Sequence, residues 1–321
     1  MTELDSRIPQ WSPEILEPRL CPLCHASNDH SMLRRDGLNL SFCPTCSLWY
    51  VSRIPGQKEL EAFYRDYFSA FRSQELDGFL AHRLTCQAQQ PDYRLDRLDS
   101  ILGGLEGRKI LEIGCGLGLF LLKAKHRGAD AVGIDLCEEA CEFARAHFHL
   151  DVSNVTLEAC NDRIGAVDAI VMNDLIEHIS DLGSFLTSLN SLLKKDGVVL
   201  IWTPNGGAAG RDAATGGQWL GFQVDFEHLQ FFSPKSVSVL GEKYGWSIEH
   251  LETRGFPDLG GVGCMNARQQ RQGFMRSMVR RFPAVRRCLW ELKGMGSKLL
   301  GKPKPPQAIG GYHLFTILRK N

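Results

Sequence analysis

The sequence changes character within one short stretch, Lys109-Ile110-Leu111-Glu112-Ile113-Gly114-Cys115-Gly116-Leu117-Gly118-Leu119-Phe120. A β-prone apolar run breaks into three glycines spaced two residues apart and then resumes with a helix-like pattern. Proteins hold nucleotide-type ligands at such strand-to-helix turns, because the backbone can approach the ligand closely there. The stretch therefore predicts an α/β domain with a ligand site at this turn.

The glycine spacing indicates which ligand the turn suits. A dinucleotide turn has the spacing G-x-G-x-x-G, and its third glycine packs the helix against the strand. Leu119 occupies that third position here, so the turn is a poor NAD loop. The pattern E-x-G-x-G-x-G resembles motif I of the class I S-adenosylmethionine (SAM) methyltransferases. The resemblance implies that SAM contacts Glu112, Gly114, Cys115, Gly116 and Gly118.

A second strand is predicted at residues 131–135, and it ends in Asp135. This carboxylate follows Gly114 by 21 residues, where a βαβ unit delivers an acid to the ribose hydroxyls. We therefore expect Asp135, with Leu136 beside it, to bind the ribose. The alternative is that Asp135 caps a helix predicted at residues 138–148.

Later segments continue the resemblance, now to the ubiquinone O-methyltransferase-like group. They are the stretch from Asn173 to His178, the triplet Thr203-Pro204-Asn205, and the segment from Phe226 to Ser233. The resemblance implies a Rossmann-like, seven-stranded, mainly parallel sheet whose last strand is antiparallel.

Two further SAM contacts are predicted from positions after strands. A short strand is expected at residues 155–158, and the family usually binds the adenine amine just after it, here at Cys160, Asn161 and Asp162. Asn173 and Asp174 end the next strand and should face the amino acid end of SAM or the acceptor, because ligands lie at the carboxyl ends of parallel strands.

The candidate catalytic residues are His178 and His228. Methyl transfer is an in-line displacement, so the enzyme positions the acceptor and removes its proton. The resemblance also offers a metal site, in which Asp174, Glu177 and His178 contribute ligands to a second divalent metal. In other members the histidine only caps or packs the helix.

The N-terminal region carries two C-x2-C pairs, Cys21 with Cys24 and Cys43 with Cys46. Four thiolates in this arrangement predict a structural Zn²⁺ site, because no coordination position is left open for a substrate. Residues 17–50 balance three arginines against three acids, which argues against a phosphate-binding surface. A zinc ribbon joined to such a core also resembles sugar and cell-surface-glycan methyltransferases.

The predicted layout has five parts. They are a zinc ribbon (17–52), a helical linker or cap (53–106), a SAM-binding core (107–254), a basic helical insertion (255–311) and a last core strand (312–321). The cap is rich in aromatic residues, and we expect one or two tyrosines to close over SAM or the acceptor. Glycines around residues 206–217 predict a lid carrying Trp219, Phe222 and Phe226.

Charge is balanced overall but not locally. The chain has 37 basic and 37 acidic residues, and residues 265–304 hold eleven lysines and arginines against Glu291 alone. Basic amphipathic helices there would suit peripheral contact with an anionic membrane, or equally a solvated surface. The N-terminus does not read as a signal peptide, and no uncharged run reaches the roughly 18 residues of a membrane span, so we expect a cytoplasmic protein with reduced cysteines.

The sequence therefore predicts a SAM-dependent methyltransferase that acts on a small-molecule, sugar or lipid-linked glycan acceptor. An RNA or protein methyltransferase is one alternative, although the neutral ribbon makes a nucleic acid partner less favoured. The other is a SAM-binding regulatory module without catalytic activity, because the glycines and Asp135 support ligand binding in both cases.

Overall fold

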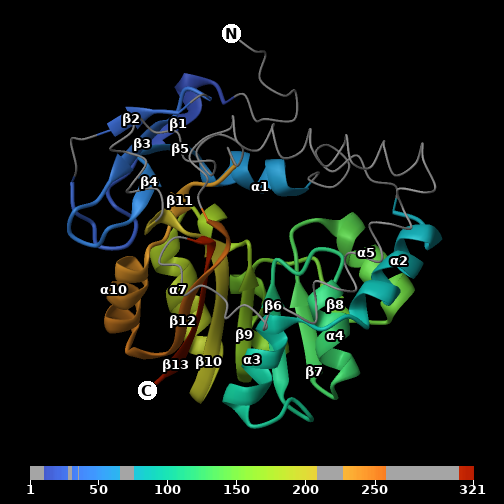
Figure 1. Cartoon of the computed structure of the whole chain (residues 1–321). Coiled ribbons are helices and arrows are strands. Elements are labelled where there is room, and N and C mark those ends of the chain that lie inside the picture. Colours follow the sequence, from blue (N-terminus) through green and yellow to red (C-terminus); the bar gives the residue numbers. More distant parts are fainter. Residues whose placement is uncertain (1–10, 28–30, 35, 66–75, 208–226, 258–310) are drawn as a thin grey trace, which may run out of the picture.

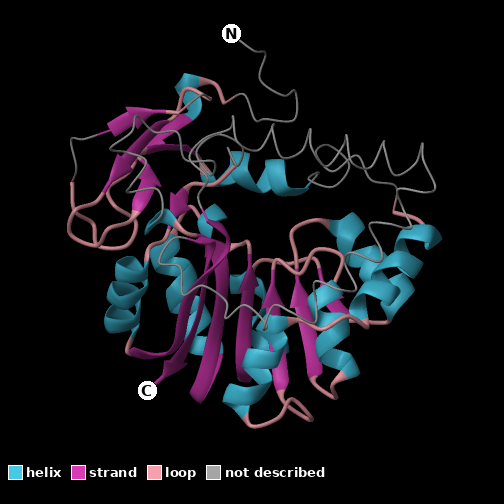
Figure 2. Ribbon diagram, viewed as in Figure 1, coloured by secondary structure: helices cyan, strands magenta, loops and turns pink. Residues whose placement is uncertain are grey.

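The structure is a computed structural model that describes residues 11–27, 31–34, 36–65, 76–207, 227–257 and 311–321 (Figures 1 and 2). Its helices are α1 (Gln57–Arg65), α2 (Gly78–Ala88), α3 (Tyr93–Leu102), α4 (Leu119–His126), α5 (Glu138–Phe148), α6 (Leu157–Ile164), α7 (Leu182–Leu192) and α10 (Pro234–Tyr244), with 3-10 turns η1 (Pro13–Ile15) and η3 (Ile176–His178). Its strands are β1 (Leu16–Pro18), β2 (Ser31–Leu33), β3 (Asn39–Phe42), β4 (Trp49–Val51), β5 (Arg53–Pro55), β6 (Lys109–Ile113), β7 (Asp130–Ile134), β8 (Asp151–Ser153), β9 (Val167–Asn173), β10 (Leu193–Pro204), β11 (Gln230–Phe231), β12 (Trp246–Pro257) and β13 (Gly311–Lys320).

The centre of the molecule is a seven-stranded sheet in the order β12-β13-β10-β9-β6-β7-β8. Strands β8, β7, β6, β9 and β10 pair in parallel, whereas β13 runs antiparallel to both β10 and β12. This is the predicted Rossmann-like architecture with an antiparallel last strand, and the prediction is confirmed. The strand order reverses at β6, so the carboxyl ends of β6 and β9 meet where ligands bind in such sheets.

Two helical layers bury the sheet on both faces. Ile113 and Met172 pack in one apolar cluster with α6, α7 and α10, while Ile110 and Val171, on the same two strands, pack in another with α2 to α5. Alternation between two buried faces explains why these strands read as continuous apolar runs.

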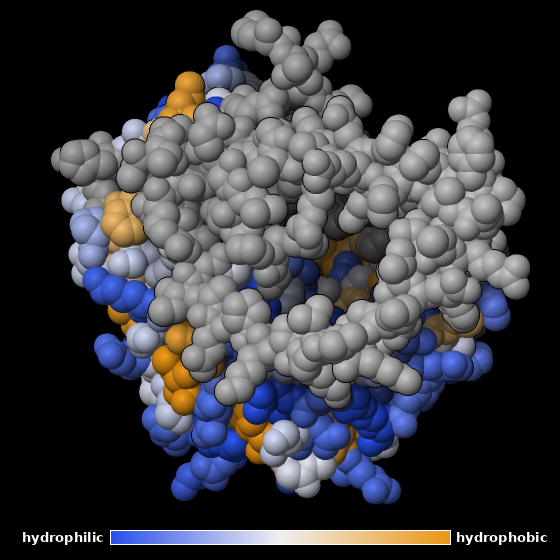
Figure 3. Space-filling model, in the orientation of Figure 1, coloured by the Kyte–Doolittle hydropathy of each residue, from blue (hydrophilic) through white to orange (hydrophobic). Residues whose placement is uncertain are grey.

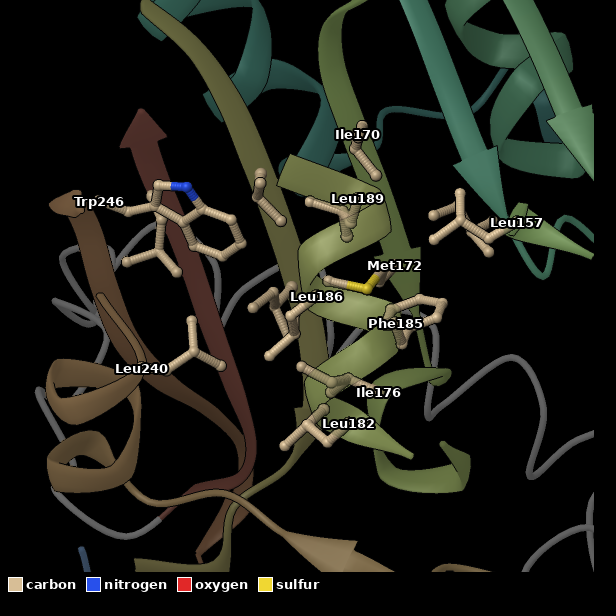
Figure 4. Packing of buried hydrophobic residues seen from close by; sticks show 14 of the residues in the cluster. Leu157, Ile170, Met172, Ile176, Leu182, Phe185, Leu186, Leu189, Leu240 and Trp246 are labelled. Atoms are coloured by element: carbon tan, nitrogen blue, oxygen red, sulfur yellow. The ribbon is translucent and has the colours of Figure 1, made fainter. Parts of the chain in front are cut away.

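Helix α7 shows how one layer is fixed (Figure 4). Its buried residues Leu182, Phe185, Leu186 and Leu189 recur at helical spacing and face strands of the sheet. Asp181 caps the helix by accepting a hydrogen bond from the Ser184 N–H at 3.0 Å. The turn that precedes α7 is η3, so this packing also anchors the segment of Glu177 and His178.

Strands β1 to β5, with both cysteine pairs, form what we call the N-terminal ribbon. It lies beside the carboxyl end of the central sheet, close to α10 and β11 (Figure 1). Its four-stranded sheet has the order β11-β4-β3-β2, so β11, which comes from the distal part of the chain, is one of its strands. The ribbon and the main domain therefore share a sheet.

One predicted strand is wrong. The third parallel strand is β8 at Asp151–Ser153, not residues 155–158, and α6 already begins at Leu157. The Thr156 hydroxyl accepts a hydrogen bond from the Ala159 N–H at 3.4 Å, so Thr156 begins a helix rather than continuing a strand. Residues 160–162 consequently lie within α6.

The described surface seen in Figure 3 is mainly hydrophilic. The large apolar side chains exposed within the described part of the chain are Leu20, Leu33, Phe79 and Ile248. In the same residues, no helix has both the length and the apolar character needed to span a membrane. The predicted lid and the basic segment 265–304 lie outside the described residues, except for Gly206 and Gly207.

Candidate active site

The glycine turn links β6 to α4 with left-handed backbone angles. The φ angles of Gly114, Gly116 and Gly118 are 71°, 49° and 78°, which side chains rarely allow. A Cβ atom on Gly118 would also lie 2.5 Å from Leu150 Cδ1, and one on Gly114 would lie 2.9 Å from Leu175 Cδ1. The three glycines are thus required by the shape of the turn itself.

Asp135 lies beside this turn at the carboxyl end of β7. Its carboxylate accepts hydrogen bonds from the Gly116 N–H at 2.7 Å and from the Cys137 N–H at 2.9 Å. Burial raises the pKa of Asp135 above its usual range, although both hydrogen bonds favour the charged form. Cys137 is the N-cap residue of α5, so the Asp135 carboxylate contacts both the glycine turn and the start of this helix.

Glu112 is a buried carboxylate behind the turn. The residue is 3% exposed, and its Oε1 atom accepts a hydrogen bond from Asn173 Nδ2 at 2.8 Å. Its Oε2 atom has no hydrogen-bond partner within the described part of the chain. Burial raises the pKa of Glu112 to about 8. A buried acceptor left open in this way can receive a donor from a ligand.

Arg94 completes this network from α3, and sequence analysis did not single it out. It donates to the Asn173 Oδ1 atom at 2.8 Å and pairs with Asp92 at 3.0 Å. The aromatic rings of Phe120 and Trp202 lie 5.6 and 5.5 Å from its guanidinium carbon. Arg94 follows the helix cap Asp92, but nothing in the local sequence shows that it reaches the end of β9, 79 residues later.

A second group lies at the ends of β9 and β10 and consists of Glu177, His178 and His228, here called the Glu-His-His cluster. The possible metal-ligand atoms of the three residues lie within 4.8 Å of one another, and the centroids of the two imidazole rings are 4.6 Å apart. The structure therefore brings together the two predicted catalytic histidines. Asp174, also predicted to bind a metal, is outside this group among the described residues.

The surroundings of the Glu-His-His cluster fix each member. Thr203 Oγ1 donates to Glu177 Oε2 at 2.9 Å, and Tyr64 Oη lies 2.7 Å from His178 Nδ1. His228 Nε2 is 3.9 Å from Glu177 Oε1. Burial, together with the neighbouring His178 and Arg34, lowers the pKa of His228 well below its usual range. Tyr64 is one of the cap tyrosines.

The four ribbon cysteines converge as predicted. The Cys21 and Cys46 sulfurs are 3.5 Å apart, those of Cys24 and Cys43 are 3.4 Å apart, and all four lie within 4.8 Å of one another. A tetrahedral zinc site with Zn–S bonds of about 2.3 Å has sulfurs separated by about 3.8 Å. These distances fit a Zn²⁺ ion.

Each cysteine pair also lies on the same kind of turn. The His25 N–H donates to the Cys21 carbonyl at 2.8 Å, and the Ser47 N–H donates to the Cys43 carbonyl at 2.7 Å. His25 and Ser47 have left-handed φ angles of 60° and 58°. Two matching knuckles therefore present the four sulfurs to one point, as a structural zinc site requires.

Comparison with known proteins identifies the family. A family model described as "Methyltransferase domain" matches residues 81–251, more than half of the 321-residue chain. The chain belongs to this methyltransferase family. The resemblance to class I SAM methyltransferases drawn from the glycine turn is thereby confirmed.

Individual relatives cover a smaller part of the chain. The "Ubiquinone biosynthesis O-methyltransferase" of Acinetobacter baylyi is 33% identical over 119 residues, which is 35% of this chain and 50% of the relative. The protein of the same name from Alkalilimnicola ehrlichii is 36% identical over 118 residues, or 35% of this chain and 48% of the relative. The chain spans about half the length of the curated relatives it matches.

Solved structures that align with the chain are more distant in sequence. A SAM-dependent methyltransferase from Archaeoglobus fulgidus aligns with a TM-score of 0.44 and 18% identity, covering 76% of this chain and all of that protein. A TehB-like SAM-dependent methyltransferase from Corynebacterium glutamicum aligns with a TM-score of 0.43 and 17% identity, covering 74% and 94%.

The remaining predicted SAM contacts can be placed in the structure. Cys115 is buried in the turn, while Leu136 is half-buried after β7. Asp174 has a φ angle of 48° where the chain leaves β9, and its N–H donates to the Trp202 carbonyl at 2.8 Å. Asn161 and Asp162 lie within α6, and their side chains lie outside the described structure.

Proposed function

We propose that this protein transfers a methyl group from SAM to an oxygen atom of a small-molecule acceptor. One observation carries the proposal: the Glu112-Asn173-Arg94 network and the Glu-His-His cluster occupy the same edge of the sheet, joined through β9 and β10. Asn173 ends β9, and η3, which carries Glu177 and His178, follows after two residues. The names of the matched relatives support transfer to oxygen.

The donor half of the site comprises the glycine turn, Asp135, Glu112 and Arg94. The open Oε2 atom of Glu112 suits a ligand ammonium group, and the Arg94 guanidinium suits a ligand carboxylate. Asp135 holds the turn in shape and presents a carboxylate where ribose hydroxyls bind in βαβ units. SAM supplies the electrophilic methyl group when it is bound.

The acceptor half is the Glu-His-His cluster. His228 is the proposed base, which takes the acceptor hydroxyl proton, and its Nε2 atom lies 3.9 Å from Glu177 Oε1. His178 is held by Tyr64, and its ring contacts that of His228 edge-on, with the ring centroids 4.6 Å apart. A sugar or a lipid-linked glycan also offers hydroxyl groups and falls within the proposed acceptor range.

A divalent metal is a second candidate use of the same side chains. Glu177, His178 and His228 offer a carboxylate oxygen and two imidazole nitrogens within 4.8 Å of one another, a ligand set that suits Mn²⁺, Fe²⁺ or Zn²⁺. Such a metal would bind the acceptor oxygen and lower its pKa. Methyl transfer that disappears in a chelator while the ribbon zinc is retained, and returns with added Mn²⁺ or Fe²⁺, would favour this candidate over the simple base.

The proposal is tested by SAM binding and by turnover. Calorimetry on the full chain should give saturable SAM binding, and release of S-adenosylhomocysteine should identify hydroxylated acceptors. His228→Gln should abolish most turnover and keep SAM affinity, whereas His126→Gln, an exposed histidine at the end of α4, should change neither. Unchanged turnover in His228→Gln would remove the base role, and absence of SAM binding would remove the proposed function.

A further inference from the structure

The Glu-His-His cluster is built partly on the N-terminal ribbon. His228 lies two residues before β11, which pairs with β4 through Gln230 opposite Tyr50 and Phe231 opposite Trp49. The Val51 N–H also donates to the Leu229 carbonyl at 2.8 Å. The segment that carries His228 is therefore an edge strand of the ribbon sheet.

Two ribbon arginines reinforce this connection at the backbone of the cluster. Arg34 donates from Nη1 to the His228 carbonyl at 2.8 Å, and its Nε and Nη2 atoms bond both oxygens of Asp36. The Arg34 and Asp36 side chains are each 1% exposed, so the pair is buried. A guanidinium held from two sides gives the carbonyl a fixed donor.

Arg19 forms hydrogen bonds with the other segments that meet near the Glu-His-His cluster. It donates to the Val51 carbonyl at 2.8 Å, to the Leu229 carbonyl at 2.7 Å and to the Ser180 carbonyl at 3.3 Å. Gln230 Nε2 adds bonds to the carbonyls of Ile176 and Ile179. The ribbon, the η3 segment and the His228 segment are thus tied by side-chain donors to backbone acceptors.

We propose that Arg34 is a positioning residue for His228 and that the N-terminal ribbon is a structural part of the acceptor half of the site. This inference rests on the proposed function of the Glu-His-His cluster. Arg34 does not contact the reacting atoms; it fixes the backbone from which the His228 ring projects. Reacting groups must be placed closely, since a shift of about 1 Å can cost roughly 100-fold in rate.

The experiment compares three variants of the full chain. Arg34→Met combined with Asp36→Asn removes the bond to His228 without leaving a buried unpaired carboxylate. The Leu38 N–H donates to Asp36 Oδ1 at 3.2 Å, and the amide oxygen introduced by Asp36→Asn can still accept this bond. Asp36→Asn alone weakens the ribbon but keeps Arg34 next to the His228 carbonyl. Arg53→Met is the control, because it removes an exposed ribbon arginine that donates to the Leu16 carbonyl, away from the cluster.

The main readout is the position of the histidine ring signals in the NMR spectrum of chain labelled at the histidine Cε1 atoms. The chain has ten histidines, and His228→Gln and His178→Gln assign the two signals that matter. We expect the double variant to move both signals and the two single variants to leave them in place. Zinc content and SAM affinity should stay within about twofold of wild type in all three variants, because neither the four-cysteine site nor the proposed SAM site includes Arg34.

The inference fails if the double variant leaves both signals unmoved, or if Asp36→Asn moves them as much as the double variant does. The second result would mean that general loosening of the ribbon, not the Arg34 bond, controls His228. If the double variant loses zinc, Arg34→Lys takes its place, since it keeps the charge next to Asp36 but has only one amine to share between Asp36 and the His228 carbonyl. Lack of SAM binding by the wild-type chain would instead count against the proposed function.

Discussion

Replacing Glu112 with glutamine should change how the stability of the protein depends on pH. The folded pKa of Glu112 is about 8, against 4.5 for an ordinary glutamate, so between these values the folded state holds a proton that the unfolded chain releases. Stability therefore falls as pH rises, by up to about 1.4 kcal/mol per unit and by less near either pKa, which gives about 3.5 kcal/mol between pH 5 and pH 8. Glutamine has no proton to lose, and this part of the slope should disappear.

The magnitude converts to a measurable shift in melting temperature. For a domain of this size 1 kcal/mol corresponds to about 2–4 °C, so the wild-type melting temperature should fall by about 7–14 °C more than that of Glu112→Gln across this range. Scanning fluorimetry at pH 5, 6, 7 and 8 measures the difference, which cancels titrations common to both proteins. At pH 5 the variant should be slightly less stable, because its amide N–H faces the position where Oε2 has no partner among the described residues.

The control for this experiment is Glu138→Gln, which changes an exposed glutamate paired with Arg145 at the start of α5. It should follow the wild-type curve. Parallel curves for Glu112→Gln and wild type would show that Glu112 is not held protonated by burial, and the reasoning about the donor half would have to be abandoned. Saturating SAM should flatten the wild-type curve, because an ammonium group near Oε2 favours the carboxylate.

Three further predictions concern other parts of the molecule. Arg94→Met should weaken SAM binding by roughly 10- to 150-fold in calorimetry, the value of one charge-assisted hydrogen bond, while His228→Gln keeps wild-type affinity; equal affinity in Arg94→Met would exclude contact with SAM. Cys43→Ser should abolish the zinc content measured by mass spectrometry and lower the melting temperature, because a metal held by the four sulfurs would stabilise the ribbon; retained zinc would contradict a four-thiolate site. Leu189→Ala, in the fully buried face of α7, should cost about 2–5 kcal/mol in urea unfolding, and a loss below about 1 kcal/mol would contradict its place in the core.

Local sequence signals predicted much of the fold. Helix α10 runs from Pro234 to Tyr244, because Ser233 forms a capping box at its start and Gly245 ends it with a left-handed φ angle of 70°. The glycine turn and Asp135 are close in sequence, and the βαβ rule brings them together. At Thr156 a short polar cap competes with a β-prone run, and the chain begins a helix where a strand is predicted.

The candidate site was harder to predict because it depends on contacts between distant segments. Asn173 could be placed at a strand end, but its partner Arg94 precedes it by 79 residues and carries no motif. His178 and His228 were named from residue type and position, whereas the hydrogen bond between Tyr64 and His178 depends on how α1 packs. Periodicity within one element carries no information about such pairs.

The two halves of the site differ in how far the family match describes them. Glu112, Asp135 and Asn173, proposed to face SAM, all lie within the matched residues 81–251. His178 and His228 lie there as well, but Arg34 and Tyr64, which contact them, come before residue 81. Arg34 is one of the three arginines that balance the acidic residues of segment 17–50. It is buried and donates a hydrogen bond to the His228 carbonyl, so it serves an internal contact of the protein. We therefore expect changes in the ribbon, which lies outside the matched residues 81–251, to alter acceptor turnover while leaving SAM binding intact.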